Sequence, residues 1–249
     1  MDTEDFERLV AAAGFIFRGS VEHHWKGEVP TIPTDSGETV AVRIDHVLRS
    51  TPVLRSFAGR EALVITKHAG ALRQSHSPIL FTECISLGQQ LLLREIGQVE
   101  ASDDASRQVA EAIHAADERP LREQVAAADL IVLGEVSESR PLDRPFPPRS
   151  EHDPLWSLAR VAVSVVLKGR KQRDDIEVLY ASSDDRVWFR SPKLHAGVSG
   201  ILLLFRLKQD EVPKGVPRSA YQATDALDFL PHERRGEIER MLGGELEGR

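Results

Sequence analysis

The segment Arg186–Arg190, within the run Asp-Arg-Val-Trp-Phe-Arg, places two aromatic rings between two guanidinium groups. In an extended chain, Trp188 would share one face with Arg186 and Arg190, and Val187 and Phe189 would share the other. An exposed tryptophan flanked by arginines is typical of a stacking or protein-docking surface. The alternative is a tryptophan packed on a helix, with the arginine stems lying over apolar surface. We take Trp188, Arg186 and Arg190 as candidate binding residues, together with the other two tryptophans, Trp25 and Trp156.

Nine histidines raise the question of a metal site. Neither the His-Glu-x-x-His pattern nor His-x-x-x-His occurs in the sequence. His23 and His24 are adjacent, so in a strand their side chains would point to opposite faces. A zinc site assembled from His23, His68 and His76 is an alternative that the sequence leaves open. The sequence predicts no cofactor.

Nucleophiles and paired carboxylates give no catalytic pattern either. Cys84 is the only cysteine, and an isolated cysteine is more often a buried apolar residue than a nucleophile. The pairs Asp174-Asp175 and Asp184-Asp185 are expected in turns at the two ends of a strand. The sequence contains no glycine-rich phosphate loop and no Gly-x-Ser-x-Gly. The chain is therefore predicted to be non-enzymatic.

Composition and charge narrow the class of partner. The 249 residues carry a net charge of −7, so the strongly basic surface that nucleic acid or an anionic membrane attracts is absent overall. The longest apolar run, Ile201–Phe205, has the length of a buried strand and not of a membrane span. One cysteine suits a reducing compartment, and the acidic start differs from a secretory signal. We expect a cytoplasmic protein, unless a leader has been removed, with a protein as its partner.

Strands must position these residues, and the clearest is Arg160–Gly169. Its apolar residues alternate with the period of a half-buried strand, and Ala41–Ser50 is a weaker copy. The matching positions on the apolar side are Val42, Ile44, His46 and Leu48 in the first copy and Val161, Val163, Val165 and Leu167 in the second. Arg49-Ser50 then matches Lys168-Gly169. His46 takes the place of Val165, so we expect a partly buried structural histidine.

Other elements repeat in the same order. Ala11–Val21 matches Ala126–Val136, and each copy has a glycine, Gly19 or Gly134, that predicts a bulge inside the strand. Third strands are expected at Ala62–Thr66 and Ile176–Tyr180, and Leu91–Leu93 is matched with Ile201–Phe205. Agreement in order and spacing indicates an internal duplication.

Helices are expected beside the strands. The apolar spacing predicts them at residues 2–13, 103–116 and 121–127, and after Pro231. The run Ala-Asp-Glu-Arg-Pro at 116–120 is expected to break the helical pattern. The predicted domains are therefore residues 1–118 and 119–249, each with flanking helices.

The second half resembles the netrin-like domain of the tissue inhibitors of metalloproteinases and their bacterial relatives. The matching residues are Asp129, Gly134, Val136, Val163, Val165, Lys168, Gly169, Gly197 and Leu203. The resemblance implies an OB-type five-stranded barrel with flanking helices. The expected fold is mainly β with flanking helices (α+β): two tandem OB-like barrels related by duplication. Neither half begins with the cysteine that those inhibitors use, so the resemblance implies no inhibitory residue here.

The expected function is a non-enzymatic protein-binding or scaffold module. Its contact surface would lie on the long loops between the first and second strands of each half, His23–Thr39 and Ser137–Ser157. One alternative is an OB-type protein that binds single-stranded nucleic acid, and another is a metal-dependent hydrolase with its site between the halves.

Overall fold

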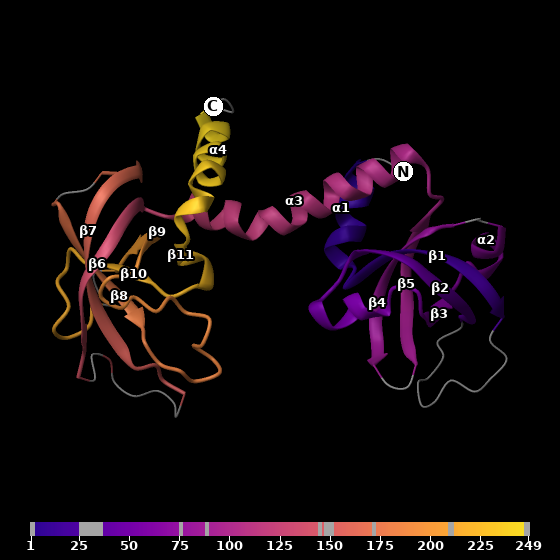
Figure 1. The fold of residues 1–249 in the computed structure, drawn as a ribbon, viewed down its shortest axis with the longest axis horizontal. Helices are drawn as coiled ribbons and strands as arrows, with labels where there is room; N and C mark the ends of the chain where they lie inside the picture. Colours follow the sequence, from indigo (N-terminus) through magenta and orange to yellow (C-terminus); the bar gives the residue numbers. More distant parts are fainter. Residues whose placement is uncertain are drawn as a thin grey trace. The chain divides into compact units, whose positions relative to one another are not determined.

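The computed structural model describes residues 3–24, 37–74, 77–87, 90–143, 146, 152–170, 173–208 and 212–246. Its internal contacts divide the chain into unit 1, Met1–Glu118, and unit 2, Arg119–Arg249, which are described separately below (Figure 1). Among the helices of these residues, none has both the length and the apolar character needed to cross a membrane.

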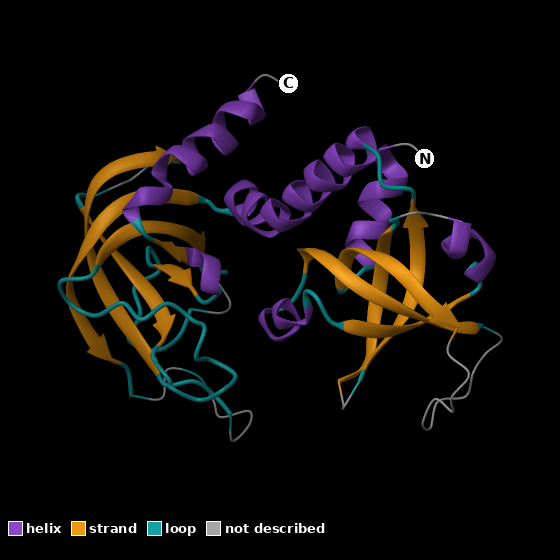
Figure 2. Cartoon of the chain, turned by 45° about the vertical axis from the view of Figure 1, so that its right-hand side comes forward, coloured by secondary structure: helices purple, strands orange, loops and turns teal. Residues whose placement is uncertain are grey.

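Unit 1 is a closed barrel of five strands with helices on its outside (Figures 1 and 2). The strand order is β1-β2-β3-β5-β4, and β1 pairs with β4 to close the ring. The third and fifth strands are parallel and the other pairs are antiparallel. The elements are α1 (Thr3–Ala12), β1 (Phe15–His24), β2 (Glu38–Arg49), η1 (Pro52–Phe57), β3 (Glu61–Thr66), α2 (Ala69–Gln74), β4 (Ile79–Leu87), β5 (Leu91–Val99) and the start of α3 (Asp103–Ala127).

Unit 2 repeats this barrel with the same connections. Strands β8, β7, β6 and β9 follow one another in the sheet, and β10 pairs with both β8 and β9, which closes the ring. A short strand, β11, adds to β9. The elements are the end of α3, β6 (Leu130–Pro141), β7 (Trp156–Lys168), β8 (Asp175–Ala181), β9 (Ser199–Arg206), β10 (Tyr221–Ala223), η2 (Ala226–Asp228), β11 (Phe229–Leu230), η3 (His232–Arg234) and α4 (Arg235–Leu246).

The predicted fold class is confirmed: the chain is mainly β, and it contains two five-stranded barrels of OB-like size. One part of the sequence alignment was wrong. Ile201 pairs with Leu133 on β6, and the residue in the same place of unit 1 is Ile79, which pairs with Arg18 on β1. Ile201–Phe205 therefore corresponds to the start of β4, which sequence reasoning missed, and Leu91–Leu93 lies on the fifth strand.

The first two strands pair in the same register in both units. Gly19 faces Ile44 in unit 1 and Gly134 faces Val163 in unit 2, as the repeat predicts. Register shifts fall at the same three places in both, including one directly before each glycine. A Cβ on Gly134 would lie 2.6 Å from Val161 Cγ1 and 2.8 Å from the Ala162 carbonyl oxygen. These glycines therefore let the second strand cross closely over the coiled first strand.

Two helices cover the outside of the first and fourth strands in each unit. In unit 1, α1 and the first part of α3 contribute Phe6, Val10, Val109 and Ala112 to a cluster with Ile16, Ile79 and Phe81. In unit 2, the last part of α3 and α4 contribute Leu121, Val125, Ile238 and Met241 to a cluster with Ile131, Ile201 and Leu203. The repeat therefore includes the helices as well as the strands.

A basic residue at the end of the second strand caps the helix that precedes the first. In unit 1, Arg49 Nη1 donates to the Val10 carbonyl oxygen at 2.7 Å. In unit 2, Lys168 Nζ donates to the carbonyl oxygens of Val125 and Ala126 at 2.8 and 2.6 Å. Cations at a helix C-terminus satisfy carbonyl groups that have no partner within the helix. The sequence match of Arg49 with Lys168 thus reflects a shared contact.

The predicted helix break before Pro120 was wrong, because α3 runs without interruption from Asp103 to Ala127. Proline removes one backbone hydrogen bond and costs a helix interior about 3 kcal/mol. Buried residues on both sides of Pro120 offset this cost: Val109 and Ala112 pack in unit 1, and Leu121 and Val125 pack in unit 2.

The fifth strand of unit 2 is split into β10 and β11 around the turn η2. Asp228, 1% exposed, holds this turn. Its Oδ1 accepts from Gln124 Nε2 at 2.5 Å, and its Oδ2 accepts from the backbone N–H groups of Thr224 and Asp225 at 2.7 and 2.8 Å. Burial raises the pKa of Asp228 above its ordinary value, although these hydrogen bonds act in the opposite direction.

We predict that Gly134→Ala destabilises unit 2 by about 2–3 kcal/mol, because the added methyl group overlaps Val161 and the β7 backbone. The measurement is urea unfolding in a Trp25→Phe background, in which the remaining tryptophans, Trp156 and Trp188, both lie in unit 2. Gly236→Ala in α4 is the matched control, since nothing lies within 4 Å of its added Cβ. Equal midpoints for the two variants would contradict the close-approach argument.

The raised pKa of Asp228 predicts a pH dependence of stability. The folded state resists ionisation of Asp228 more than the unfolded state does, so this group's contribution is full below pH 3.8 and is lost as the pH rises through the raised pKa. Asp228→Asn keeps the shape and does not titrate. The unfolding free energy of the natural chain, minus that of the variant, should therefore fall with rising pH and then level off. A difference that is constant with pH contradicts the assignment.

Candidate functional site

Two long segments of unit 2 meet at one end of its barrel. The pairs Pro141↔Ser157 and Trp156↔Ala181 lie at the adjoining ends of β6, β7 and β8. The β6–β7 connection, 142–155, and the β8–β9 connection, 182–198, therefore start from the same rim. We call this region the loop end of unit 2.

Hydrogen bonds join these two connections. The Ser182 backbone N–H donates to the Leu155 carbonyl oxygen at 2.7 Å. Trp188 Nε1 donates to the His152 carbonyl oxygen at 2.8 Å, and His152 Nδ1 lies 3.4 Å from Asp185 Oδ2. The Val187 N–H and the His152 imidazole lower the pKa of Asp185. An ionised Asp185 is thus part of the link between the two segments.

Aromatic rings form the floor of the loop end. The Trp156 ring lies 5.2 Å from the Phe146 ring and 6.2 Å from the Trp188 ring, centroid to centroid, with tilted planes in both pairs. Tilted aromatic pairs at these distances are attractive beyond the area they bury. Trp156 and Trp188 are both partly buried. The two tryptophans therefore support the loops and present only part of their surface to solvent.

The segment Arg186–Arg190 is a turn, so the alternation expected of an extended chain does not apply to it. Asp185 Oδ1 accepts from the Val187 N–H at 2.9 Å, and the Asp185 carbonyl oxygen accepts from the Trp188 N–H at 2.9 Å. Trp188 is drawn inward as a result. Val187 and Phe189 instead point to solvent, with 62% and 61% of their surfaces exposed.

Exposed apolar side chains therefore project from the joined loops. Leu155, on the β6–β7 connection, is 70% exposed. We call Leu155, Val187 and Phe189 the apolar triad. Arg186 and Arg190 are exposed beside it, and the Arg190 guanidinium carbon lies 5.6 Å from the Phe189 ring centroid. Trp25, the remaining candidate from the sequence, lies outside the described residues.

A lysine that sequence reasoning missed holds the turn in place. Lys193 Nζ, partly buried, donates to the carbonyl oxygens of Ser183 and Trp188 at 2.5 and 3.3 Å and lies 3.4 Å from that of Ala181. An ammonium group with three donors suits a cluster of carbonyl oxygens. No pattern in the sequence marks Lys193, because its partners come together only through the turn.

The outer face of β7 and β8 is covered by the unit's own connections. Leu158 and Leu179, on these strands, are buried against Val216 and Ala220 from the β9–β10 connection and against Leu142 and Phe146 from the β6–β7 connection. This face of an OB barrel, with these two loops, is the one that binds oligonucleotides in proteins of that kind. In unit 2 it is filled by the chain itself.

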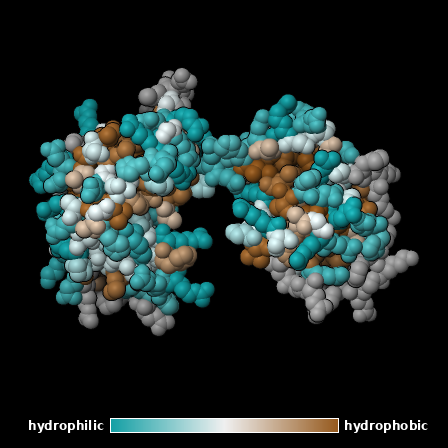
Figure 3. Space-filling model, viewed as in Figure 1, coloured by the Kyte–Doolittle hydropathy of each residue, from teal (hydrophilic) through white to brown (hydrophobic). Residues whose placement is uncertain are grey.

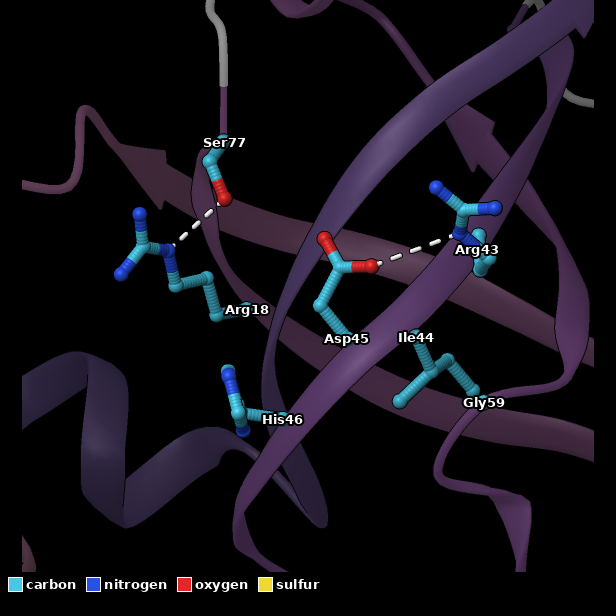
Figure 4. A pocket seen from close by; sticks show the side chains of 7 residues that line it. All are labelled: Arg18, Arg43, Ile44, Asp45, His46, Gly59 and Ser77. Carbon is cyan, nitrogen blue, oxygen red and sulfur yellow. Dashed lines mark hydrogen bonds and ion pairs between the residues drawn. The ribbon is translucent and has the colours of Figure 1, made fainter.

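Unit 1 has a polar hollow of about 520 Å³ on its outer surface (Figure 4). Arg18 Nε donates to Ser77 Oγ at 2.7 Å, and Arg43 Nε lies 3.5 Å from Asp45 and 3.3 Å from Glu22. His46 is exposed there, so the prediction of a partly buried histidine was wrong. Val165, its counterpart, packs beside the helices of unit 2, whereas His46 lies across from Arg18.

The chemistry-bearing residues from the sequence do not converge. Within the described part of the chain, no group of three or more His, Cys, Asp or Glu side chains could hold a metal ion. Of the three histidines proposed for zinc, His76 is outside that part. Burial raises the pKa of the Cys84 thiol, so less of it is the reactive thiolate at neutral pH. In Figure 3 both hydrophilic and hydrophobic residues show on the visible face of each unit.

No model of a known protein family matches the chain, and no curated protein matches it.

We predict that Lys193→Met loosens the loop end. Loss of the ammonium leaves the carbonyl oxygens of Ser183 and Trp188 without this donor, and unit 2 should be destabilised by about 1–3 kcal/mol. In the Trp25→Phe background, the fluorescence of Trp156 and Trp188 should also shift to the red under native conditions. Lys214→Met, at an exposed lysine of the same unit, should change neither. A native emission spectrum unchanged by Lys193→Met contradicts the assigned role.

Proposed function

We propose that this protein is a non-enzymatic binding module, and that the loop end of unit 2 docks on a protein partner. The observation that carries the proposal is the apolar triad: three large apolar side chains, each more than 60% exposed, on loops held by hydrogen bonds and aromatic contacts. Exposed apolar residues on a braced loop lose little conformational freedom when they bind, which favours affinity. Arg186 and Arg190 favour a partner whose apolar groove is rimmed by carboxylates.

The same reasoning favours protein over nucleic acid. The face of β7 and β8 is occupied by the chain's own loops, and the overall charge is negative.

We also propose that the two barrels are netrin-like units used as scaffolds, which their order of helix, five strands and helix supports. A single cysteine supports the cytoplasm as the location.

Site-specific photo-crosslinking tests the proposal. A photoreactive amino acid is placed in the full chain at Phe189, and at Val53 as the matched control, because Val53 is a 65% exposed apolar residue of unit 1. We expect a protein adduct from Phe189 in cells of the source organism and none from Val53. Adducts of equal pattern from both positions, or none from Phe189, contradict the proposal.

The affinity for the captured partner gives the second test. The double variant Val187→Ser/Phe189→Ser should bind the purified partner about 100-fold more weakly, since central apolar contacts contribute about 1–2 kcal/mol each. Val53→Ser should bind like the natural chain. A double variant that binds equally well excludes the apolar triad. Low-salt binding of single-stranded DNA or RNA that this variant abolishes assigns the surface to nucleic acid instead.

A further inference from the structure

Three matched interior positions of the two barrels carry side chains of different chemistry. Strand register matches Thr66, Thr82 and Glu95 of unit 1 with Tyr180, Leu204 and Ala223 of unit 2. The three residues of unit 2 belong to its hydrophobic core. Their counterparts in unit 1 are two hydroxyl groups and a carboxyl group. A barrel of this kind therefore closes without a carboxyl group at the position of Glu95, where unit 2 has Ala223.

Among these three residues of unit 1, Glu95 is the one whose burial is expected to cost folding free energy. Its side chain is 2% exposed, and its Oε1 has no hydrogen-bond partner among the described residues. Its Oε2 accepts from the Thr66 hydroxyl, and Thr66 Oγ1 also accepts from the His68 backbone N–H at 2.8 Å. A buried polar oxygen without a partner costs the full desolvation of that group. Because unit 2 avoids this cost at the same position, Glu95 must be explained by something other than the fold.

His68 lies beside Glu95 Oε1, the oxygen that has no hydrogen-bond partner among the described residues. Its Nδ1 is 3.5 Å from Glu95 Oε1, and its side chain is 67% exposed. Two ligands of a tetrahedral zinc ion, at about 2.0–2.1 Å each, lie about 3.3–3.4 Å apart. The observed separation is close to this value. Imidazole nitrogen with carboxylate oxygen is a donor set that first-row transition metals accept, while Ca²⁺ and Mg²⁺ prefer oxygen alone.

We propose that His68 Nδ1 and Glu95 Oε1 bind a divalent first-row transition-metal ion such as Zn²⁺ at the end of β3. Thr66 holds the far oxygen of Glu95 and fixes the backbone of His68, so it orients both ligands. No third His, Cys, Asp or Glu of the described residues joins them, so water completes the coordination. The site is independent of the docking surface proposed for unit 2.

Metal titration tests the site on the untagged full chain. Isothermal calorimetry with Zn²⁺, and with Co²⁺ as a spectroscopic probe, should give one equivalent that raises the melting temperature. His68→Ala and Glu95→Gln should each weaken this binding by about 100-fold, and Thr66→Val by about tenfold. His68 is exposed, so its variant remains informative if Glu95→Gln or Thr66→Val fails to fold.

A second His–Glu pair provides the matched control. His114 Nδ1 lies 3.6 Å from Glu118 Oε1 on the surface of α3, and neither oxygen of Glu118 is among the buried atoms without a partner. His114→Ala should leave the stoichiometry and affinity unchanged. Absence of Zn²⁺ and Co²⁺ binding by the natural chain overturns the proposal. Binding that survives both His68→Ala and Glu95→Gln, or that His114→Ala removes, also overturns it.

Discussion

The close contact between the first two strands of each barrel is the constraint on which the rest of the structure depends. At Gly19 and Gly134 the facing strand approaches so closely that a Cβ would overlap backbone oxygen and valine side-chain atoms. The register shifts beside these glycines coil the first strand, and this coiling lets it pair with both the second and the fourth strands. Closure of the ring, the interior core and the rim that bears the loops all follow from this contact.

A single backbone plan then supports two different interiors. Unit 2 fills its barrel with apolar side chains, among which Tyr180 satisfies its hydroxyl group through Ser139 at 2.8 Å. Unit 1 has Glu95 at the position of Ala223, and one oxygen of its buried carboxyl group has no hydrogen-bond partner among the described residues. The duplication provides an internal control, because the fold is formed both with and without the polar group. It thereby separates what the barrel requires from what an additional role requires.

The loop end of unit 2 shows how a rigid frame presents apolar residues. Lys193 and Asp185 satisfy backbone groups within the turn, and Trp188 is held against Trp156. With these interactions made inside the turn, Val187 and Phe189 have no interior position left and face solvent. The outer face of the neighbouring strands is closed by other parts of the same chain. Under the proposed function, a partner would therefore contact the loops and not this face.

Strand periodicity and the repeat were enough to predict a mainly β chain with an internal duplication, the bulges at the glycines and the match of Arg49 with Lys168. These features depend on the alternation of apolar residues along each strand and on the internal repeat, and both can be identified in the sequence alone. The five-stranded barrels were implied by the resemblance to netrin-like domains. Strand β4 was not predicted from the sequence, because Thr82, Glu83 and Cys84 interrupt its apolar alternation. Pairing with β1 on one side and β5 on the other makes it a strand. The helix across Pro120 was missed for a similar reason, since its packing outweighs a local signal.

The candidate sites were decided almost entirely by tertiary structure. The sequence drew attention to Trp188 and its arginines, but the exposure of Val187 and Phe189 follows from a turn held by Asp185 and Lys193. Leu155 joins them through a hydrogen bond between segments 27 residues apart in the chain. Glu95 and His68 are also separated by 27 residues, and only the parallel pairing of β3 with β5 brings them together. Residue types and periodicity determine which elements form, while the charge and exposure of a site depend on which distant groups the closed barrel brings into contact.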